Sequence, residues 1–488
     1  MAAKDNTAAR GTVALVLSRG GYFVLGYLAV VVLARELGPA AYGVYSVIMA
    51  LLVWLEESGR YAVPSATAKR LSETSSPSDH EAFERSALAL NLGVHIFFFL
   101  VLWVLAPWLA SWFDIEHGAL LFRLAAIDLP LFGLYTAIQA IHQGHRHFML
   151  LGVSQVAYAF AKFAGVLSLM VIGVSLEKAL IINVLSTIVG CVFLFPKIGL
   201  RWQGQWFSKV SPLVTLAVPI GLYYFPLMLR STLLLGTLRI LLPDSEEATI
   251  GILMAAVNIA RVPAFALATV TVVILPSISS ALARDDLALA RQYLQQALRF
   301  FAILFLPACF VLVVESEALM RFIYSDAFAG GGLLLGLLVI SEGLYTIQAI
   351  LGSVLHGAGE MRKTAVVILL ALVPYLGLLV LLTQIGGAVG AVWAAVVTPL
   401  LGIAVFGAMI WRRFGSLMPQ SRVAKLALAG GLMFGTEWLL PELEGWWMLL
   451  HGIGLVVYSL TLMVCREITW DDVRTVLPAK RVERQALT

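Results

Sequence analysis

Residues 364–411 decide the fold: TAVVILLALVPYLGLLVLLTQIGGAVGAVWAAVVTPLLGIAVFGAMIW. The stretch contains no charged residue, and a glycine pair, Gly386 and Gly387, stands near its middle. One membrane-spanning helix needs about 20 predominantly apolar residues. The stretch therefore predicts two transmembrane helices, 364–384 and 388–411, separated by a break at the glycines.

The rest of the chain has the same character. Of its 488 residues, 60% are apolar and only 13% are charged, and the mean hydropathy is +0.91. Soluble domains are about 45–50% apolar and about 25% charged, so a water-soluble globule is excluded. The net charge of +4 is spread over many connections rather than gathered in one basic surface, so we expect no nucleic-acid partner.

Apolar runs separated by charged or Pro/Gly-containing breaks predict an all-α polytopic membrane protein with fourteen transmembrane helices. The runs are 12–34, 43–67, 86–110, 118–141, 148–172, 179–196, 213–238, 249–280, 295–314, 328–356, 364–384, 388–411, 423–440 and 446–465. Lysine and arginine are concentrated in alternate connections, which identifies those connections as cytoplasmic. Both termini are then cytoplasmic, and the opposite, outer connections contain only four basic residues: Arg35, Lys178, Arg239 and Arg321.

The chain contains a weak internal repeat. Residues 41–45 (AYGVY) resemble residues 249–253 (TIGIL), and residues 63–65 resemble residues 275–277 at nearly the same offset. Six spans per repeat is an even number, so both halves enter the membrane from the same side and the repeat is parallel. We predict two parallel six-helix bundles at 1–200 and 201–415, two additional transmembrane helices at 416–465, and a cytoplasmic tail at 466–488.

We single out ten charged residues inside the predicted spans, where a charge costs about 2.5–3.5 kcal/mol on insertion scales. Such groups must face water or one another, so they are the candidate functional residues. They are Arg19, Arg60, Arg123, Lys162, Arg230, Arg261, Glu56, Glu57, Asp128 and Glu342.

Three arginines are the main candidates for binding substrate. Arg19 and Arg230 are 211 positions apart, so the repeat would give them equivalent places in the two halves. Arg261 lies deep in its span, directly before a proline-containing turn. Forked guanidinium groups suit the oxygens of phosphate, although Arg19 is near enough to a helix end to reach the membrane surface instead.

Arg60 and Lys162 are further candidate substrate contacts. Glu56 and Glu57 precede Arg60 by about one helical turn, so a salt bridge along one helix is an equal alternative. Arg123 lies near the outer end of its span and is expected to anchor the protein at the membrane interface.

The acidic residues are candidates for coupling transport to H⁺ or Na⁺, and we expect no other cofactor. For the two that lie near span centres, an interhelical ion pair is an equal explanation. The candidates for ion coupling are Glu56, Glu57, Asp128 and Glu342.

No metal site or catalytic motif is predicted. His142, His145 and His147 crowd one cytoplasmic turn, where we expect solvation by water and headgroups rather than metal binding. The cysteines are far apart, and the chain contains no nucleotide-binding or hydrolase motif.

A longer pattern covers the first two spans. Residues 34–46 read ARELGPAAYGVYS, and PSA at 64–66 and KRLSE at 69–73 follow. This pattern resembles the amino-terminal signature of the polysaccharide-exporter flippases of the multidrug/oligosaccharidyl-lipid/polysaccharide exporter superfamily. Over the rest of the chain the resemblance rests on architecture, repeat and length.

The resemblance implies two six-helix bundles in a V shape, as in the MATE transporters of the same superfamily, that open alternately to either side of a bacterial inner membrane. A cationic cavity would take the pyrophosphate and sugars of a polyprenol-linked oligosaccharide, with Arg19, Arg230 and Arg261 in helices that supply cavity cations in related flippases. The implied protein is not an enzyme, and its partners are the lipid-linked oligosaccharide, membrane lipids, and a polysaccharide polymerase and glycosyltransferases.

Two other functions remain open. A cation-coupled multidrug exporter shares the architecture, but basic residues outnumber acidic ones inside the spans. A polysaccharide polymerase is a weaker alternative, because every predicted outer connection is short.

Overall fold

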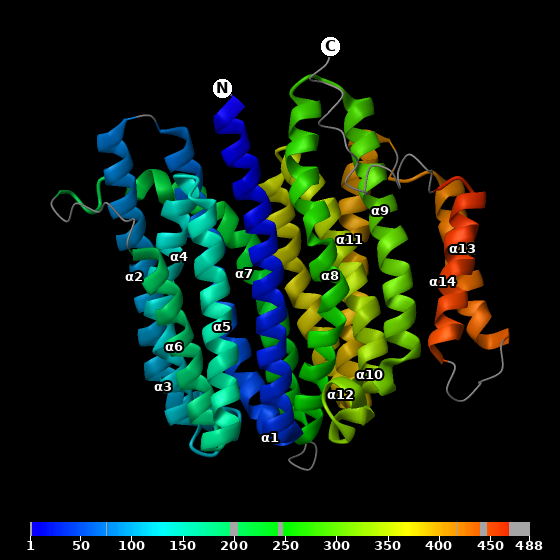
Figure 1. Cartoon of the computed structure of the whole chain (residues 1–488), viewed down its shortest axis with the longest axis horizontal. Coiled ribbons are helices and arrows are strands. Elements are labelled where there is room, and N and C mark those ends of the chain that lie inside the picture. Colours follow the sequence, from blue (N-terminus) through cyan, green and yellow to red (C-terminus); the bar gives the residue numbers. More distant parts are fainter. Residues whose placement is uncertain are drawn as a thin grey trace. The chain divides into compact units, whose positions relative to one another are not determined.

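The computed structural model describes residues 2–74, 76–195, 204–242, 247–415, 417–439 and 447–467, and within these ranges the regular secondary structure is helical. Helices satisfy their backbone hydrogen bonds internally, as a hydrocarbon environment demands. Figure 1 labels the α-helices. In chain order the elements are α1 (Ala2–Glu73), α2 (Pro77–Trp112), α3 (Gly118–Ala126), α4 (Asp128–Gly144), α5 (Phe148–Ile172), α6 (Leu176–Leu194), α7 (Val210–Leu241), α8 (Glu247–Leu282), α9 (Leu287–Val314), α10 (Ser316–Ile323), the 3₁₀ helix η3 (Asp326–Gly331), α11 (Gly332–Gly357), α12 (Met361–Phe414), α13 (Gln420–Leu439) and α14 (Trp447–Val464).

The predicted fold class is confirmed. Each predicted span coincides with a helix: α1 and α12 carry two spans each, α3 and α4 together form one, and α10 is a short helix between spans. In the described part of the chain, ten helices are long and apolar enough to cross a membrane. Most of the predicted tail, 468–488, lies outside the described residues.

Glycines separate the paired spans within α1 and α12. Gly38 has φ 71° directly before Pro39, and Gly387 has φ 55° directly after Gly386. Positive φ is strained for residues with a Cβ but not for glycine. The break expected in the charge-free stretch 364–411 is therefore present at the predicted glycines.

The chain divides into two compact units. The first contains residues 1–259, 317–338 and 360–402, and the second contains residues 260–316, 339–359 and 403–488. This division follows contacts rather than the repeat, and the predicted bundle boundaries stay predictions.

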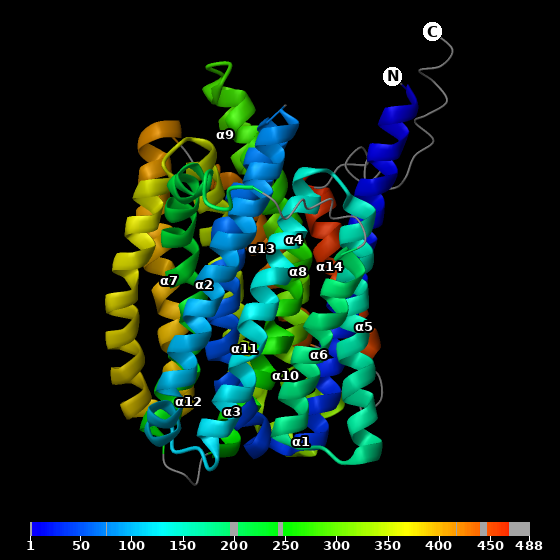
Figure 2. The same cartoon turned by 90° about the vertical axis from the view of Figure 1, so that its left-hand side faces the viewer.

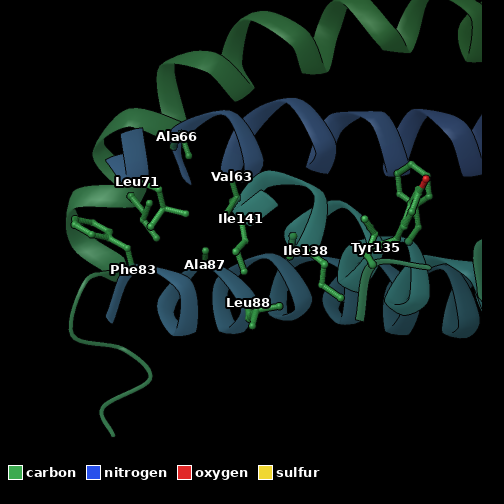
Figure 3. Close-up of a cluster of buried hydrophobic side chains, with 14 of the residues drawn as sticks. Val63, Ala66, Leu71, Phe83, Ala87, Leu88, Tyr135, Ile138 and Ile141 are labelled. Carbon is green, nitrogen blue, oxygen red and sulfur yellow. The ribbon is translucent and has the colours of Figure 1, made fainter. Parts of the chain in front are cut away.

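In the first unit, α2, α4, α5 and α6 run side by side (Figure 2), and α1 packs against α4 and α5. An apolar cluster fills the space between α1, α2 and α4, with Val63 on α1, Leu88 on α2, and Ile138 and Ile141 on α4 (Figure 3). Lipid tails are as apolar as these side chains, so their close packing, rather than exclusion from water, stabilises the contact.

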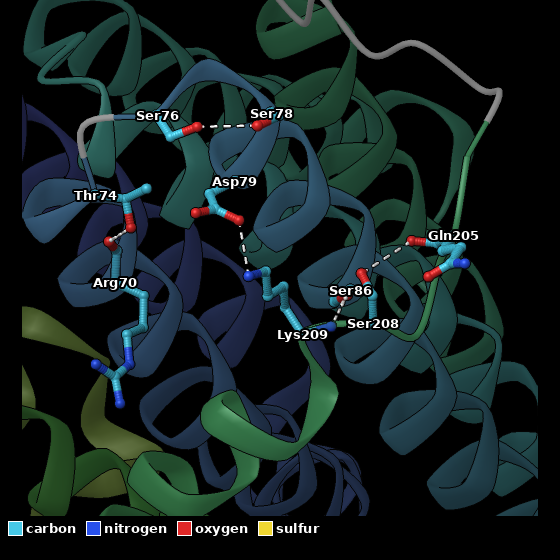
Figure 4. A network of polar contacts seen from close by, with 9 residues as sticks. All are labelled: Arg70, Thr74, Ser76, Ser78, Asp79, Ser86, Gln205, Ser208 and Lys209. Carbon is cyan, nitrogen blue, oxygen red and sulfur yellow. Dashed lines mark hydrogen bonds and ion pairs between the residues drawn. The ribbon is translucent and has the colours of Figure 1, made fainter.

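Polar contacts fix the start of α7 against α2. Lys209 Nζ lies 2.7 Å from Asp79 Oδ1, and the Lys209 backbone N–H donates to Ser86 Oγ at 3.1 Å (Figure 4). The Lys209 ammonium also lies 5.4 Å from the centre of the Phe83 ring. These contacts anchor the chain where it begins the second predicted half.

In the second unit, α13 and α14 pack together and both contact α9. Phe310 of α9 meets Phe434 of α13 edge-on at 4.9 Å, and the Tyr458 hydroxyl of α14 donates to the carbonyl of Ile303 at 3.1 Å. The two helices predicted to follow the second bundle are thus joined to α9.

Helices α1 and α8 meet at the residues that the repeat relates. A Cβ on Gly251 would lie 1.9 Å from the Pro39 carbonyl oxygen and 3.0 Å from the Gly43 nitrogen. Asn258 Nδ2 donates to the Tyr42 hydroxyl at 2.9 Å. The segments 41–45 and 249–253, similar in sequence, therefore lie in direct contact within the first unit.

We predict that Gly251→Ala destabilises the protein by about 1–3 kcal/mol, because its methyl group would overlap a backbone oxygen that cannot swing away. Thermal unfolding of the purified protein in detergent measures the effect. Gly377→Ala is the matched control, since nothing lies within 4 Å of the added Cβ. The control should be neutral or stabilising by about 0.5–1 kcal/mol, and equal unfolding midpoints for both variants would contradict this account of the crossing.

Candidate functional site

Three of the predicted intramembrane residues meet in one buried network in the first unit. Lys162 Nζ of α5 donates to Asn183 Oδ1 of α6 at 2.7 Å, and Asn183 Nδ2 donates to Asp128 Oδ2 of α4 at 2.6 Å. The Glu56 carboxyl of α1 lies within hydrogen-bonding reach of the Asp128 carboxyl. We call these four residues the carboxylate network.

The charge balance of this network is incomplete. Glu56 is 5% exposed and Asp128 is 0% exposed, and among the described residues Glu56 Oε1 and Asp128 Oδ1 have no hydrogen-bond partner. Two carboxylates against one ammonium leave one negative charge, which is expensive to bury uncompensated. One proton or one monovalent cation neutralises the network, and a hydrogen bond between two carboxyl groups itself requires a proton.

Local structure explains how Asp128 is held. It follows Ile127, whose helical backbone joins α3 to α4, and its Oδ2 accepts from Asn183 Nδ2 of α6 at 2.6 Å. On α6, Thr187 stands one turn after Asn183, and its hydroxyl donates to the Asn183 carbonyl at 3.3 Å. Asn183 was not predicted as a site residue, because an uncharged amide does not stand out in the sequence. Its spacing of four from a threonine in an apolar run was the available signal.

Arg60 forms a different pair. Its Nη1 lies 3.0 Å from Glu57 Oε1, three residues earlier on α1, with 31% of the Arg60 side chain exposed. Tyr22 also hydrogen-bonds to Arg60. The helix-face salt bridge is therefore present, and it involves Glu57, whereas Glu56 turns to Asp128. A substrate contact by Arg60 stays a prediction.

The three main arginines lie in different surroundings. Arg19 is exposed on α1, and Arg230 is half-buried on α7, where its carbonyl accepts from the Tyr375 hydroxyl at 3.2 Å. Arg261 belongs to the second unit, where its Nε lies 3.7 Å from Glu342 Oε1. The ion pair considered for Glu342 is thus present, and convergence of the three arginines on one cavity stays a prediction.

Arg123 packs beside an aromatic ring. Its guanidinium carbon lies 5.5 Å from the centre of the Trp103 ring, a cation–π arrangement. Tryptophan is typical of the membrane interface, so this contact supports the predicted anchoring role.

The histidines of the turn after α4 contact α2 and α6. His145 Nε2 lies 2.5 Å from Glu84 Oε1 of α2, and His142 Nε2 lies 3.0 Å from the Leu194 carbonyl of α6. His142 is 1% exposed, so the expectation that this turn is solvated is wrong for that residue. The physical reason is that the ring hydrogen-bonds to the end of α6 and to His147, 3.1 Å away. No group of three His, Cys, Asp or Glu in the described ranges is placed to hold a metal ion.

An apolar groove of about 450 Å³ runs between α7 and the first part of α12, both in the first unit. Arg362, in the first turn of α12, is its one charged lining residue and has no hydrogen bond or ion pair with any described residue. We call it the α7/α12 groove. Its lining residues are Val214, Thr215, Val218, Pro219, Leu222, Arg362, Ala365, Val366 and Leu369.

Comparison with known proteins agrees with this architecture. A family model described as a polysaccharide biosynthesis protein matches residues 32–330. No curated protein is similar enough in sequence to count as a relative.

Solved structures share the fold. A lipid II flippase MurJ in an inward closed conformation has a TM-score of 0.77 over 93% of this chain and 99% of that chain, with 14% identity. An inward-facing multidrug resistance MATE family transporter of the MOP superfamily has a TM-score of 0.65, with 15% identity; the match covers 81% of this chain and 95% of that chain. A MOP superfamily transporter from Pyrococcus furiosus has a TM-score of 0.59, with 14% identity; the match covers 84% of this chain and 96% of that chain.

Proposed function

Because the chain belongs to the polysaccharide biosynthesis protein family and has the fold of flippases and transporters, we propose that it is a flippase for a polyprenyl-pyrophosphate-linked oligosaccharide. The family match over residues 32–330 is the observation that carries the proposal. The flippase moves its substrate from the cytoplasmic to the outer leaflet by alternating access, for surface polysaccharide biosynthesis. It resides in a bacterial inner membrane with both termini cytoplasmic, and its neighbours in the pathway are glycosyltransferases and a polymerase.

The energetic task is to carry a charged headgroup across about 30 Å of hydrocarbon. Guanidinium groups replace water around the diphosphate, because two adjacent N–H donors match two phosphate oxygens. Arg19, Arg230 and Arg261 supply these donors, with Arg60 and Lys162 as further contacts. The pairs Arg60–Glu57 and Arg261–Glu342 keep two of the cations neutralised until a phosphate takes the place of the carboxylate.

The lipid part of the substrate needs an apolar path. The α7/α12 groove offers one, since its walls are apolar except for Thr215 and Arg362. In this proposal a polyprenyl chain lies along the groove and Arg362 meets a phosphate oxygen at the membrane surface.

The carboxylate network supplies the coupling. With one proton it is neutral, and without the proton it carries one buried negative charge, so protonation and conformation are linked. Transport is then driven by proton exchange at Glu56 and Asp128. Glu57 and Glu342, the other two predicted coupling residues, are engaged with Arg60 and Arg261.

We predict that Arg19→Ala, Arg230→Ala and Arg261→Ala each slow flipping about tenfold or more, tenfold being about 1.4 kcal/mol of barrier. Fluorescent lipid-linked oligosaccharide in proteoliposomes, quenched from one side, measures the rate. Arg284→Ala, at an exposed site outside the predicted spans, is the control. Normal flipping by all three variants would exclude these residues as the substrate site.

We predict that Asp128→Asn and Glu56→Gln each abolish proton movement linked to transport and leave the fold intact, because one carboxylate against Lys162 is already neutral. A pH-sensitive dye inside proteoliposomes records the protons when substrate is added. Glu36→Gln, which removes an exposed acid elsewhere on α1, should behave as the unmodified protein. Unchanged proton movement in both network variants would rule out this coupling site.

We predict that Val218→Trp, which fills the α7/α12 groove, lowers the affinity for lipid-linked substrate about tenfold and leaves binding of the free oligosaccharide diphosphate unchanged. Leu370→Trp, at an exposed position of α12 outside the groove lining, is the matched control. Equal lipid-substrate affinity for the two tryptophan variants would remove the groove from the proposal.

A cation-coupled multidrug exporter is the second candidate, favoured by the carboxylate network and by the MATE-like fold. Drug-susceptibility assays separate the two functions. Raised resistance on expression, without flipping of lipid-linked sugar, would favour the exporter.

A further inference from the structure

Arg35 caps a helix from the other predicted half of the chain. It stands three residues before the Gly38 kink of α1, and its Nε donates to the Ile323 carbonyl at 2.7 Å. Its Nη2 donates to the neighbouring carbonyl of Phe322. Both acceptors end α10, and all these residues belong to the first unit.

Arg239 makes a similar contact from the second predicted half to the first. It lies in the last turn of α7, and its Nε donates to the Phe113 carbonyl at 2.7 Å. Its Nη2 donates to the Asp114 carbonyl at 2.6 Å. Phe113 caps the C-terminus of α2, so this acceptor too is a helix end in the opposite half.

The two contacts occupy corresponding places in the two predicted halves. Phe113 and Phe322 are 209 positions apart, close to the offset of 208 between segments 41–45 and 249–253, whereas Arg35 and Arg239 are 204 apart and lie at corresponding span ends rather than at equivalent positions of the repeat. Each arginine follows the first span of its half and reaches the connection after the third span of the other half. The glycine crossing of α1 and α8, itself formed by the repeat-related segments, belongs to the same unit.

Physical chemistry makes these contacts strong. The last carbonyls of a helix have no partner within the helix and carry the negative end of its dipole. A guanidinium presents two parallel N–H donors that match two successive carbonyls, which a lysine ammonium cannot do.

We propose that Arg35 and Arg239 form a symmetric arginine latch that keeps the two halves together at the membrane face where the outer connections are predicted. Opening this face requires both guanidinium groups to leave their carbonyls, so the latch sets the population of the outward-open state. The inference concerns the conformational equilibrium alone and goes beyond the proposed substrate and coupling.

Spin labels test the latch without substrate. Cys191, Cys309 and Cys465 are first replaced by alanine, and labels are placed at Leu120 and Leu333, which are 53% and 62% exposed in the first unit. Pulsed electron resonance on the full-length protein in lipid nanodiscs gives the ratio of long to short label distances. Arg35→Ala and Arg239→Ala should each raise this ratio about tenfold, and the double variant about a hundredfold.

Arg321→Ala is the control for loss of an arginine at the same face of the protein. Arg321 lies in a predicted outer connection like the latch residues, but its ion pairs, 3.2 Å to Glu317 and 2.9 Å to Asp326, stay within its own segment. Arg321→Ala should leave the distance ratio unchanged. Arg35→Lys and Arg239→Lys keep the charge and lose the fork, and they carry the test if the alanine variants do not fold.

The proposal is overturned by unchanged distances in the latch variants, by an effect at only one of the two arginines, or by an equal effect of Arg321→Ala. Because the distances are read in the absence of substrate, failure of the latch is distinguishable from failure of the proposed flippase activity.

Discussion

Lipid hydrocarbon offers no hydrogen-bond partner and no counter-charge, and this constraint governs the molecule from its backbone to its charged side chains. Backbone groups within the described spans bond within helices, and the kinks of α1 and α12 fall at glycines that tolerate positive φ. Several charged side chains inside the spans likewise have partners within the protein. Arg60 pairs with Glu57, Arg261 with Glu342, and Lys162 is linked to Asp128 through Asn183.

Helix α1 carries three of the features described for the first unit. Arg35 of the latch lies on the span before Gly38, and Tyr42 at the crossing with α8 and Glu56 of the carboxylate network lie on the span after it. A displacement of the span after Gly38 therefore acts on the crossing with α8 and on the buried carboxyl pair together.

Features that depend on local composition, such as the positions of the helices, could be predicted from the sequence. The charge-free stretch 364–411 and similar runs located the helices, because length and hydropathy suffice for a span. The Arg60–Glu57 pair was also predictable, since residues three apart on a helix are neighbours.

Contacts between distant segments were beyond such reasoning. Glu56, Asp128 and Lys162 were each singled out as costly intramembrane charges, but nothing local shows that three helices bring them to one place. Asn183, which joins two of them, is unremarkable as an uncharged residue in an apolar run. The partners of Arg35 and Arg239 are carbonyl groups, which every residue possesses.

The latch arginines bind main-chain oxygens rather than side chains. A contact from an arginine to main-chain oxygens leaves the acceptor positions free to mutate, because any residue at 113, 114, 322 or 323 presents the same carbonyl. Methods that infer proximity from correlated substitutions have no second amino acid to follow at such a contact. The two arginines would persist among homologues as fixed residues with no covarying partner, even though they join segments more than a hundred positions apart.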